Sequence, residues 1–419
     1  MSDTSLKSRH AGTLHNQSIF NMTRAMVLHE TPTGHPEALN ALQNMVEGWL
    51  TGMGGLTERI SSPDYGDILI ARTPGHSGSG AGSGPGSGAG SGPSVLYLGH
   101  MDTVHPIGHL KQNPIRELGG GEWLMPGSYD MKAGNAIAIA AFEQALETGG
   151  NVTLMLTPDE EIGSPFSAPY IREEAAAHDY VLVGEGERAD QSIVTSRKGV
   201  GRYTLTVHGR DGHGGNTAHE GGNANLELAR QLLAIEDFMN TVNAGRDADH
   251  ALILNAGIMG GGTAANSVPG RAYVEISARA PDKMAVQEIE AYLHSLKPED
   301  AQCRIECGGG FYRQPWTGQA SDNGFLETAS AITADHGWAL RPANMQSGGS
   351  DANIAAEVNA NVIDGLGARG GDDHSPNEWI HVPTLGQKAR IMAALFTELP
   401  APAPCLRRGY VSHPALSHS

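Results

Sequence analysis

The sequence is poor in aromatic residues and positive charge, and it has no long apolar run. Aromatics make up 5% of the 419 residues, and 28 Lys and Arg face 46 Asp and Glu, a net charge of -18. This charge argues against nucleic acid as a partner, because phosphate binding requires a basic surface. No stretch approaches the ~20 apolar residues of a membrane span, and the N-terminal residues lack the apolar segment of a secretory signal. We therefore expect a cytoplasmic protein that binds neither nucleic acid nor membranes.

Cysteine is also scarce, with Cys303, Cys307 and Cys405 only. An odd count without a dense pattern is typical of free thiols in a reducing compartment. Cys303 and Cys307 lack a second Cys/His pair, so a zinc finger is not expected.

Residues 75–93 read GHSGSGAGSGPGSGAGSGP. A Gly/Ser-rich segment of this kind cannot pack a core. Because it lies between two expected strands, 67–72 and 95–98, we interpret it as a long flexible hairpin loop. A phosphate-binding loop is the alternative, but the Lys-Ser/Thr ending and the following helix are missing.

Apolar strands alternate with helices on both sides of a central insertion. Strands are expected at 95–98, 152–156, 180–183 and 360–363, and helices at 19–26, 36–53, 133–148, 167–177, 323–336 and 385–399. This alternation predicts an α/β fold with a mixed, mainly parallel sheet covered by helices on both faces. We assign this discontinuous catalytic domain to residues 1–197 and 311–419.

The insertion has a different order of elements. Strands are expected at 201–209, 251–259, 272–280 and 302–306, and helices at 223–240 and 283–296. This is the βαββαβ order of a ferredoxin-like unit. We assign residues 198–310 to an inserted lid domain.

Histidines and carboxylates follow the apolar strands of the catalytic domain, never those of the insertion. They are His100, Asp102, Asp130, Glu160, Glu161, Glu185 and His374. The carboxyl ends of strands are where α/β proteins assemble ligand sites. Two histidines and three carboxylates suit zinc, and they suffice for two ions if one carboxylate bridges. The set predicts a two-metal hydrolase.

Each residue also has a simpler interpretation. His100 and Asp102 lie on the same side of an extended segment, so Asp102 can accept the second ring N–H of His100. An isolated His-x-Asp sequence, however, is more often a pair of surface residues. Asp130 could be an ordinary helix cap. Glu160 and Glu161 could simply belong to a solvated acidic loop, whereas in the functional interpretation one binds metal while the other takes a proton from water.

Two further positions stay open from the residues alone. Glu187 competes with Glu185 as the ligand, and the remaining histidines, such as His105 and His109, are expected on the polar surface.

Seven motifs in register resemble the M20 family of zinc peptidases and acylases, and most of all its glutamate carboxypeptidase (carboxypeptidase G2) branch. They are LGHMDTV, GSYDMKAG, TPDEEIGS, VGEGE, DGHGG followed by GGNANLELA, GGSDA and HSPNE, between about residues 95 and 400. The Gly/Ser-rich segment is not part of this pattern.

The resemblance implies two Zn²⁺ ions, with Co²⁺ or Mn²⁺ as substitutes. Asp130 would bridge the ions, His100 and Glu185 would complete one site, and Glu161 and His374 the other. Glu160 would be the general base, and Asp102 would orient His100.

The resemblance also assigns residues of the lid and its neighbourhood. His213 would polarise the substrate carbonyl in the partner subunit of a homodimer formed through the lid, and Asn266 would contact substrate. Arg279 and Gly349, with Arg313 as a weaker candidate, would hold the free carboxylate of the substrate, since Arg–carboxylate pairing can be bidentate.

The expected function is hydrolysis of a small peptide or N-acyl amino acid that releases an amino acid with a free carboxylate. A carboxypeptidase is the first interpretation, an N-acyl amino acid deacylase the second and a dipeptidase the third. A catalytically silent metal-binding scaffold is the alternative from another class, but a structural zinc site needs no free base such as Glu160 beside it.

Overall fold

The computed structural model describes residues 15–75, 92–216 and 222–402. The chain divides into two compact units. The first comprises residues 1–195, 318–343 and 350–419, and the second comprises residues 196–317 and 344–349. His100, Asp102, Asp130, Glu160, Glu161, Glu185 and His374 all belong to the first unit.

The first unit is built on a six-stranded mixed sheet in the order β1-β2-β6-β3-β7-β16. Its strands are β1 (Leu56–Ile60), β2 (Ile68–Arg72), β3 (Ser94–His100), β6 (Asn151–Thr157), β7 (Tyr180–Val183) and β16 (Val362–Ile363). The β6, β3, β7 and β16 strands run parallel, whereas β1 and β2 are antiparallel to their neighbours. The mixed α/β sheet is confirmed.

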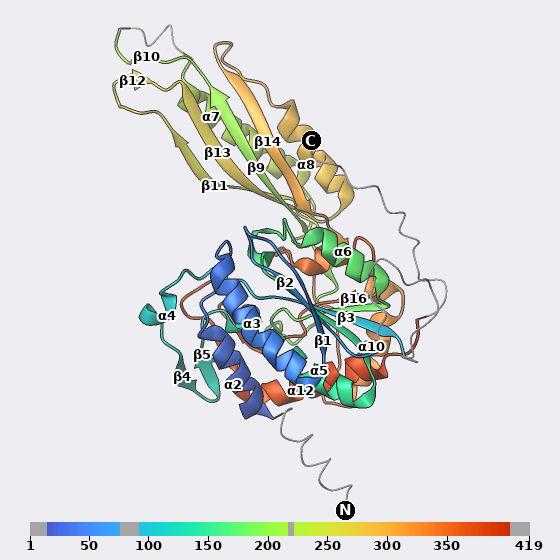
Figure 1. Ribbon diagram of the computed structural model, residues 1–419. Helices are drawn as coiled ribbons and strands as arrows, with labels where there is room; N and C mark the ends of the chain where they lie inside the picture. Colours follow the sequence, from blue (N-terminus) through green and yellow to red (C-terminus); the bar gives the residue numbers. More distant parts are fainter. Residues whose placement is uncertain (1–14, 76–91, 217–221, 403–419) are drawn as a thin grey trace, which may run out of the picture. The chain divides into compact units, whose positions relative to one another are not determined.

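Helices cover both faces of this sheet (Figure 1). They are α2 (Asn16–Val27), α3 (Pro36–Met53), α5 (Ala133–Thr148), α6 (Ala168–Ala177), α9 (Gln319–Asp322), α10 (Phe325–Ala334), α11 (Asp351–Ala355) and α12 (Leu385–Glu398). Alternate strand residues such as Val95 and Tyr97 join the core formed with α2, α3, α5, α10 and α12. The intervening residues are also buried, and α11 packs over the other face with α6. Burial on both faces explains the nearly continuous apolar strands.

The α5 helix is buried along most of its length, which explains its alanine-rich sequence. It packs against α12 and the sheet, and a side chain at Gly134 would collide with the carbonyl of Gly184. The helix ends at Gly149, which has a φ of 75°. This left-handed conformation favours glycine at the end of a helix.

A smaller four-stranded sheet lies beside the candidate site, in the order β17-β18-β5-β4. Its strands are β4 (Arg116–Gly119), β5 (Glu122–Leu124), β17 (Gly370–Gly371) and β18 (Trp379–His381). Short helical segments complete the unit: α4 (His109–Gln112), η1 (Ser128–Lys132), η2 (Glu160–Ile162) and η3 (Val382–Thr384). The sequence did not predict this sheet, because strands of two to four residues carry too little periodicity.

The second unit has a four-stranded antiparallel sheet in the order β11-β13-β9-β14. Its main elements are β9 (Gly199–His208), α7 (Ala224–Val242), β11 (Ile253–Gly261), β13 (Arg271–Ala280), α8 (Lys283–Ser295) and β14 (Arg304–Arg313). Two short pairs join β10 (Gly212–His213) with β12 (Ser267–Val268), and β8 (Ser196–Arg197) with β15 (Trp316–Thr317). The two helices contribute to a separate apolar core.

The second unit is larger than the segment 198–310 expected from the sequence. The β14 strand continues to Arg313, and the β8–β15 pair carries the unit on to Thr317. Residues 344–349 also belong to it, since Lys198 donates its backbone N–H to the carbonyl of Gln346 and Arg279 Nε donates to the carbonyl of Ser347.

The interpretation of residues 75–93 as a hairpin loop is wrong. The flanking strands β2 and β3 are not paired with each other, because β6 lies between them. Residues 76–91 lie outside the described part of the chain, as does Cys405.

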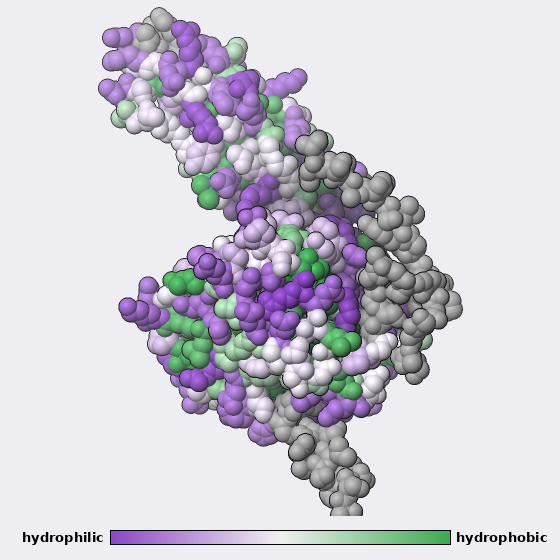
Figure 2. All heavy atoms as spheres, viewed as in Figure 1, coloured by the Kyte–Doolittle hydropathy of each residue, from purple (hydrophilic) through white to green (hydrophobic). Residues whose placement is uncertain are grey.

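Cys303 and Cys307 are free thiols. Within residues 15–75, 92–216 and 222–402, no helix is long and apolar enough to cross a membrane. Figure 2 shows a mostly hydrophilic surface with small, separated apolar groups on the visible face.

Candidate metal centre

The candidate centre is organised around Asp130, which lies in η1 just before α5. Its Oδ1 is 2.8 Å from His100 Nε2, and its Oδ2 is 3.1 Å from His374 Nε2. Each carboxylate oxygen thus faces a different histidine. The alternative that Asp130 is only a helix cap is wrong: the cap of α5 is Lys132, which makes no capping side-chain hydrogen bond.

Two more carboxylates extend the cluster, one on each side of Asp130. Glu161 Oε2 is 3.2 Å from His374 Nε2, and Glu185 Oε1 is 3.9 Å from His100 Nε2. Glu187, which competes with Glu185 in the sequence, lies instead 3.4 Å from Lys388 Nζ in a buried ion pair. The geometry therefore favours Glu185 at the centre.

The carboxylates strongly favour positive charge on the two histidines. Hydrogen bonds with Asp130 and Glu161 raise the pKa of His374 to about 11. Burial acts to lower the pKa of His100, but its hydrogen bonds with Asp102 and Asp130 outweigh burial and leave the pKa well above its usual value.

The pKa values of two acidic side chains are shifted as well. Burial, together with the charge of Asp130, raises the pKa of both Glu161 and Glu185. Crowded buried carboxylates of this kind are unfavourable unless a positive charge compensates them. The centre therefore has the electrostatics of a cation site.

The donor atoms fit a divalent metal. Glu161 Oε1 is buried and has no hydrogen-bond partner within the described residues, although it borders the cluster. Ligand atoms of His100, Asp130 and Glu161 lie within 4.8 Å of one another, as do those of Asp130, Asp373 and His374. Imidazole nitrogens and carboxylate oxygens are ligands that zinc accepts. Asp373 directly precedes the HSPNE motif and was not predicted as a ligand.

Asp102 is fully buried beneath Glu160 and Glu161. Its Oδ1 accepts the Glu160 backbone N–H at 3.2 Å, and its Oδ2 accepts the Glu161 backbone N–H at 3.2 Å and the Thr33 hydroxyl at 2.7 Å. The carboxylate is 3.4 Å from His100 Nδ1, whereas the Asp102 backbone carbonyl is closer, at 2.9 Å. Asp102 thus fixes η2 as well as His100, a contact that sequence spacing does not show.

Glu160 lies at the start of η2 and is largely buried. Its charge contributes to the raised pKa of Glu185. Of the adjacent pair, Glu161 lies 3.2 Å from His374 Nε2, and the charge of Glu160 acts on the pKa of Glu185.

One expectation about the surface histidines is wrong. His105 is buried, and its Nε2 lies 2.9 Å from Glu378 Oε2, while its ring stacks on that of His109 at 4.4 Å. Its acidic partner lies more than 250 residues further along the chain, so local polarity could not indicate burial.

The second unit brings His213 and Asn266 together. The β10 and β12 strands pair His213 with Ser267, and Gly214 donates its N–H to the Asn266 carbonyl at 2.7 Å. Nδ1 of His213 accepts the N–H groups of Gly215 and Asn216, at 3.0 and 3.1 Å. A neutral His213 therefore carries its ring proton on Nε2, which can donate to a carbonyl oxygen.

Arg279, Arg313 and Gly349 also lie together in the second unit. Arg279 on β13 and Arg313 on β14 both pair in register with Val200 on the central strand β9. A Cβ atom on Gly349 would lie 2.7 Å from Val200 Cγ2 and 3.1 Å from Arg313 Cδ. Burial, with the charges of Arg313 and Arg202, lowers the pKa of Arg279. These arginines form a cationic group around a loop that requires glycine.

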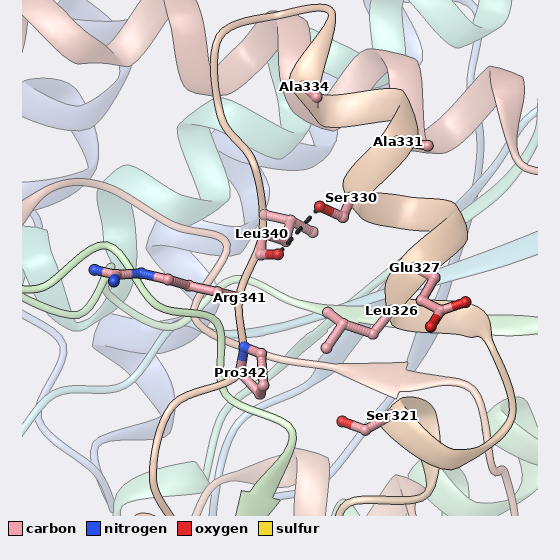
Figure 3. Close-up of a pocket in the computed structure, with 9 residues that line it drawn as sticks. All are labelled: Ser321, Leu326, Glu327, Ser330, Ala331, Ala334, Leu340, Arg341 and Pro342. Carbon is pink, nitrogen blue, oxygen red and sulfur yellow. Dashed lines mark hydrogen bonds between the residues drawn. The ribbon is translucent and has the colours of Figure 1, made fainter.

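A separate pocket of about 590 Å³ lies in the first unit against α10 (Figure 3). Leu326 and Leu340 line it, and the Ser330 hydroxyl donates to the Leu340 carbonyl. Arg341 points away from Glu327 and donates to the carbonyl of Asp190. None of the candidate ligands lines this pocket, and its polar groups do not converge as in a typical ligand site.

A family model described as peptidase family M20/M25/M40 matches residues 96–398. Carboxypeptidase G2 from Pseudomonas sp. (strain RS-16) is 26% identical over 93% of this chain and 91% of that protein. Succinyl-diaminopimelate desuccinylase from Nitrosospira multiformis is 27% identical over 71% of this chain and 81% of that protein.

The same fold occurs in the M20 family metallo-carboxypeptidase Sso-CP2 from Sulfolobus solfataricus. The TM-score is 0.67, with 16% identity over 91% of this chain and 99% of that chain.

Proposed function

Because the chain belongs to peptidase family M20/M25/M40 and is a metal-binding hydrolase of that family, we propose that it uses two metal ions to cleave an amide bond and release an amino acid with a free carboxylate. The observation that carries this proposal is the placement of Asp130. Its two oxygens face His100 and His374, and Glu185 and Glu161 lie beyond them.

In this proposal, Asp130 is shared between two sites. His100 and Glu185 hold one ion, and His374 and Glu161 hold the other, with zinc favoured by the two imidazoles. The ions would supply Lewis acidity, which lowers the pKa of water and polarises a carbonyl. The buried Glu161 Oε1, without a partner among the described residues, supports this assignment.

Glu160 is proposed as the general base. Its carboxylate accepts a proton from the attacking water and passes it to the nitrogen of the leaving amine. The Glu160 backbone N–H donates to Oδ1 of Asp102, so a buried carboxylate fixes the backbone of the proposed base. A base positioned in this way contributes roughly 10²- to 10⁴-fold to the rate.

We assign the second unit as a ferredoxin-like lid, supported by its order of elements and its antiparallel sheet. His213 would donate its Nε2 proton to the carbonyl oxygen of the substrate, and Asn266 would contact the substrate beside it. Arg279 and Arg313, with the Gly349 loop, would bind the free carboxylate by charge-assisted hydrogen bonds.

The lid is also the proposed surface for a homodimer. Leu226 and Leu233 on α7 are exposed, and so are Ile258 and Met259 on β11. Leu226 and Leu233 lie on one face of the helix, because they are seven residues apart. In the part of the chain that the structure describes, β11 is an edge strand paired only with β13. Exposed apolar side chains beside an open strand edge favour association, and the mass of the protein in solution tests whether it is a dimer.

A deacylase is the second candidate, favoured by the match to a desuccinylase. The experiment is a hydrolysis screen of dipeptides and N-acyl amino acids in which the C-terminal residue is varied first. Release of the C-terminal amino acid, with loss of activity when its carboxylate is amidated, supports the proposal. Equal cleavage of amidated substrates would reject the carboxylate site.

A further inference from the structure

Glu378 is a fully buried carboxylate that the proposed chemistry does not use. It follows His374 by four residues and directly precedes β18. In the sequence it is the last residue of the motif HSPNE, and no role was predicted for it. Buried acidic side chains are rare unless they are paired or hydrogen-bonded.

The Glu378 carboxylate is surrounded by hydrogen-bond donors. Oε1 accepts the backbone N–H groups of Tyr129 and Asp130, at 2.8 and 3.0 Å. Oε2 accepts the N–H of Gly127 at 2.6 Å and lies 2.9 Å from His105 Nε2. A carboxylate has about four acceptor positions, so these donors occupy all of them.

Three of the four donors belong to the segment that carries Asp130. They lie at the start of η1, where backbone N–H groups have no carbonyl partner one turn earlier. The neighbouring N–H of Ser128 is bonded separately, to the Met125 carbonyl at 3.1 Å. Glu378 therefore satisfies the groups that would otherwise leave this segment without fixed hydrogen bonds.

Glu378 is itself held firmly by its backbone. Its carbonyl accepts the Met125 N–H at 2.9 Å, and the next residue, Trp379, pairs with Leu124 in the β18–β5 ladder. The backbone of residues 378–379 thus bonds to the start of the segment from Leu124 to Asp130, and the Glu378 side chain bonds to its end. His374 is on the same stretch of chain as Glu378.

We propose that Glu378 is a positioning residue that fixes the Asp130 segment against the His374 segment, and so sets the distance between two metal ligands. This inference rests on the proposed roles of Asp130 and His374 as ligands. Glu378 binds no metal itself, because its oxygens are occupied by the four donors. Partners that orient metal ligands typically change metal affinity or activity by about 10- to 100-fold when mutated.

The test is the zinc affinity of Glu378→Gln in the full chain. The protein is stripped with a chelator and titrated with Zn²⁺ in a calorimeter, and the visible spectrum of the Co²⁺ form is recorded. Glutamine has the same size, but its amide NH₂ would face a backbone donor. We expect zinc affinity about 10- to 100-fold below wild type and an altered Co²⁺ spectrum.

Glu227→Gln is the matched control. Glu227 is also fully buried, and it accepts the N–H groups of Glu299 and Asp300 and hydrogen bonds from Gln231 and Arg230, but it lies in the second unit. The Glu227→Gln variant should be less stable than wild type, while its zinc affinity stays at the wild-type value. Equal zinc affinity in Glu378→Gln and wild type would overturn the inference, as would an equal loss in the control.

Glu378→Asp keeps the charge but withdraws the carboxylate by one methylene, and it replaces the glutamine variant if that variant does not fold. Zinc affinity below wild type supports the inference, and unchanged affinity rejects it. A wild-type protein that binds no zinc would instead reject the proposed function, so the two failures are distinguishable.

Discussion

The buried carboxylate of Asp102 accepts the backbone N–H of Glu160 at 3.2 Å. The same side chain accepts the N–H of Glu161 and lies 3.4 Å from His100 Nδ1. It also accepts the hydroxyl of Thr33, in the segment before α3. Asp102 therefore contacts the proposed base, Glu160, and two proposed ligands, Glu161 and His100. This contact explains how an adjacent pair of glutamates can be placed for two different tasks.

Asp102→Asn should disturb the base and the ligands together. One oxygen would become an NH₂ group, which cannot accept the hydrogen bonds that reach it. We expect activity roughly 10- to 100-fold lower, the usual effect of losing such an orienting partner. Steady-state kinetics and bound-metal content check this, and wild-type values for both would show that Asp102 orients nothing.

Glu160→Gln should keep the metal and lose turnover. Glutamine cannot take a proton from water, so kcat should fall by roughly 10²- to 10⁴-fold, the usual contribution of a general base. The matched control is Glu161→Gln, which removes a proposed ligand and should lower metal content. Substantial residual kcat in Glu160→Gln would reject the assignment of the base.

Much of the fold could be predicted from the sequence. Apolar runs and helical periodicity marked α3, α5 and β7 at their observed bounds. The motifs also pointed to the residues that gather around Asp130. These signals are local, because each depends on burial or on spacing within one element.

The contacts between distant segments could not be predicted. The Gly/Ser-rich segment was expected to close a hairpin, but strand order is set by packing that inserts β6 between β2 and β3. His105 looked like a surface residue, because its partner Glu378 is brought to it only by the folded sheet. The hydrogen bond from the Glu160 N–H to Asp102 could not be predicted for the same reason, because Glu160 follows a different strand.

Gly349→Ala should weaken the second unit and the proposed carboxylate site. The new Cβ would lie 2.7 Å from Val200 Cγ2, and overpacking of this kind costs about 1–3 kcal/mol. Displacement of Arg313 should raise KM more than it lowers kcat. Gly348→Ala is the control, since its nearest neighbour would be Arg197 NH1 at 3.8 Å. Equal effects of both variants on melting and on KM would contradict this account.

Stability should depend on pH through Lys388. Burial lowers its pKa to about 8, with the charge of Glu187 opposing the shift. Between this value and the pKa of about 10.4 in the unfolded chain, the unfolded state binds more protons. Stability should therefore rise with pH across this window, by about 3 kcal/mol at most.

The double variant Glu187→Gln/Lys388→Met removes both charges and serves as the reference. Denaturant unfolding at a series of pH values should show wild-type stability increasing relative to this variant from pH 8 to about 10. A constant difference between the two proteins would mean that Lys388 titrates normally.

We propose that Asp130 and the four side chains around it, His100, Glu161, Glu185 and His374, hold two metal ions needed for hydrolysis. The most direct test is metal analysis of the active full-length protein before and after chelation, with activity measured on the same samples. We expect about two ions per chain, loss of activity with loss of metal, and recovery on adding Zn²⁺. Full activity in a metal-free sample, or saturation by a single ion, would contradict the account.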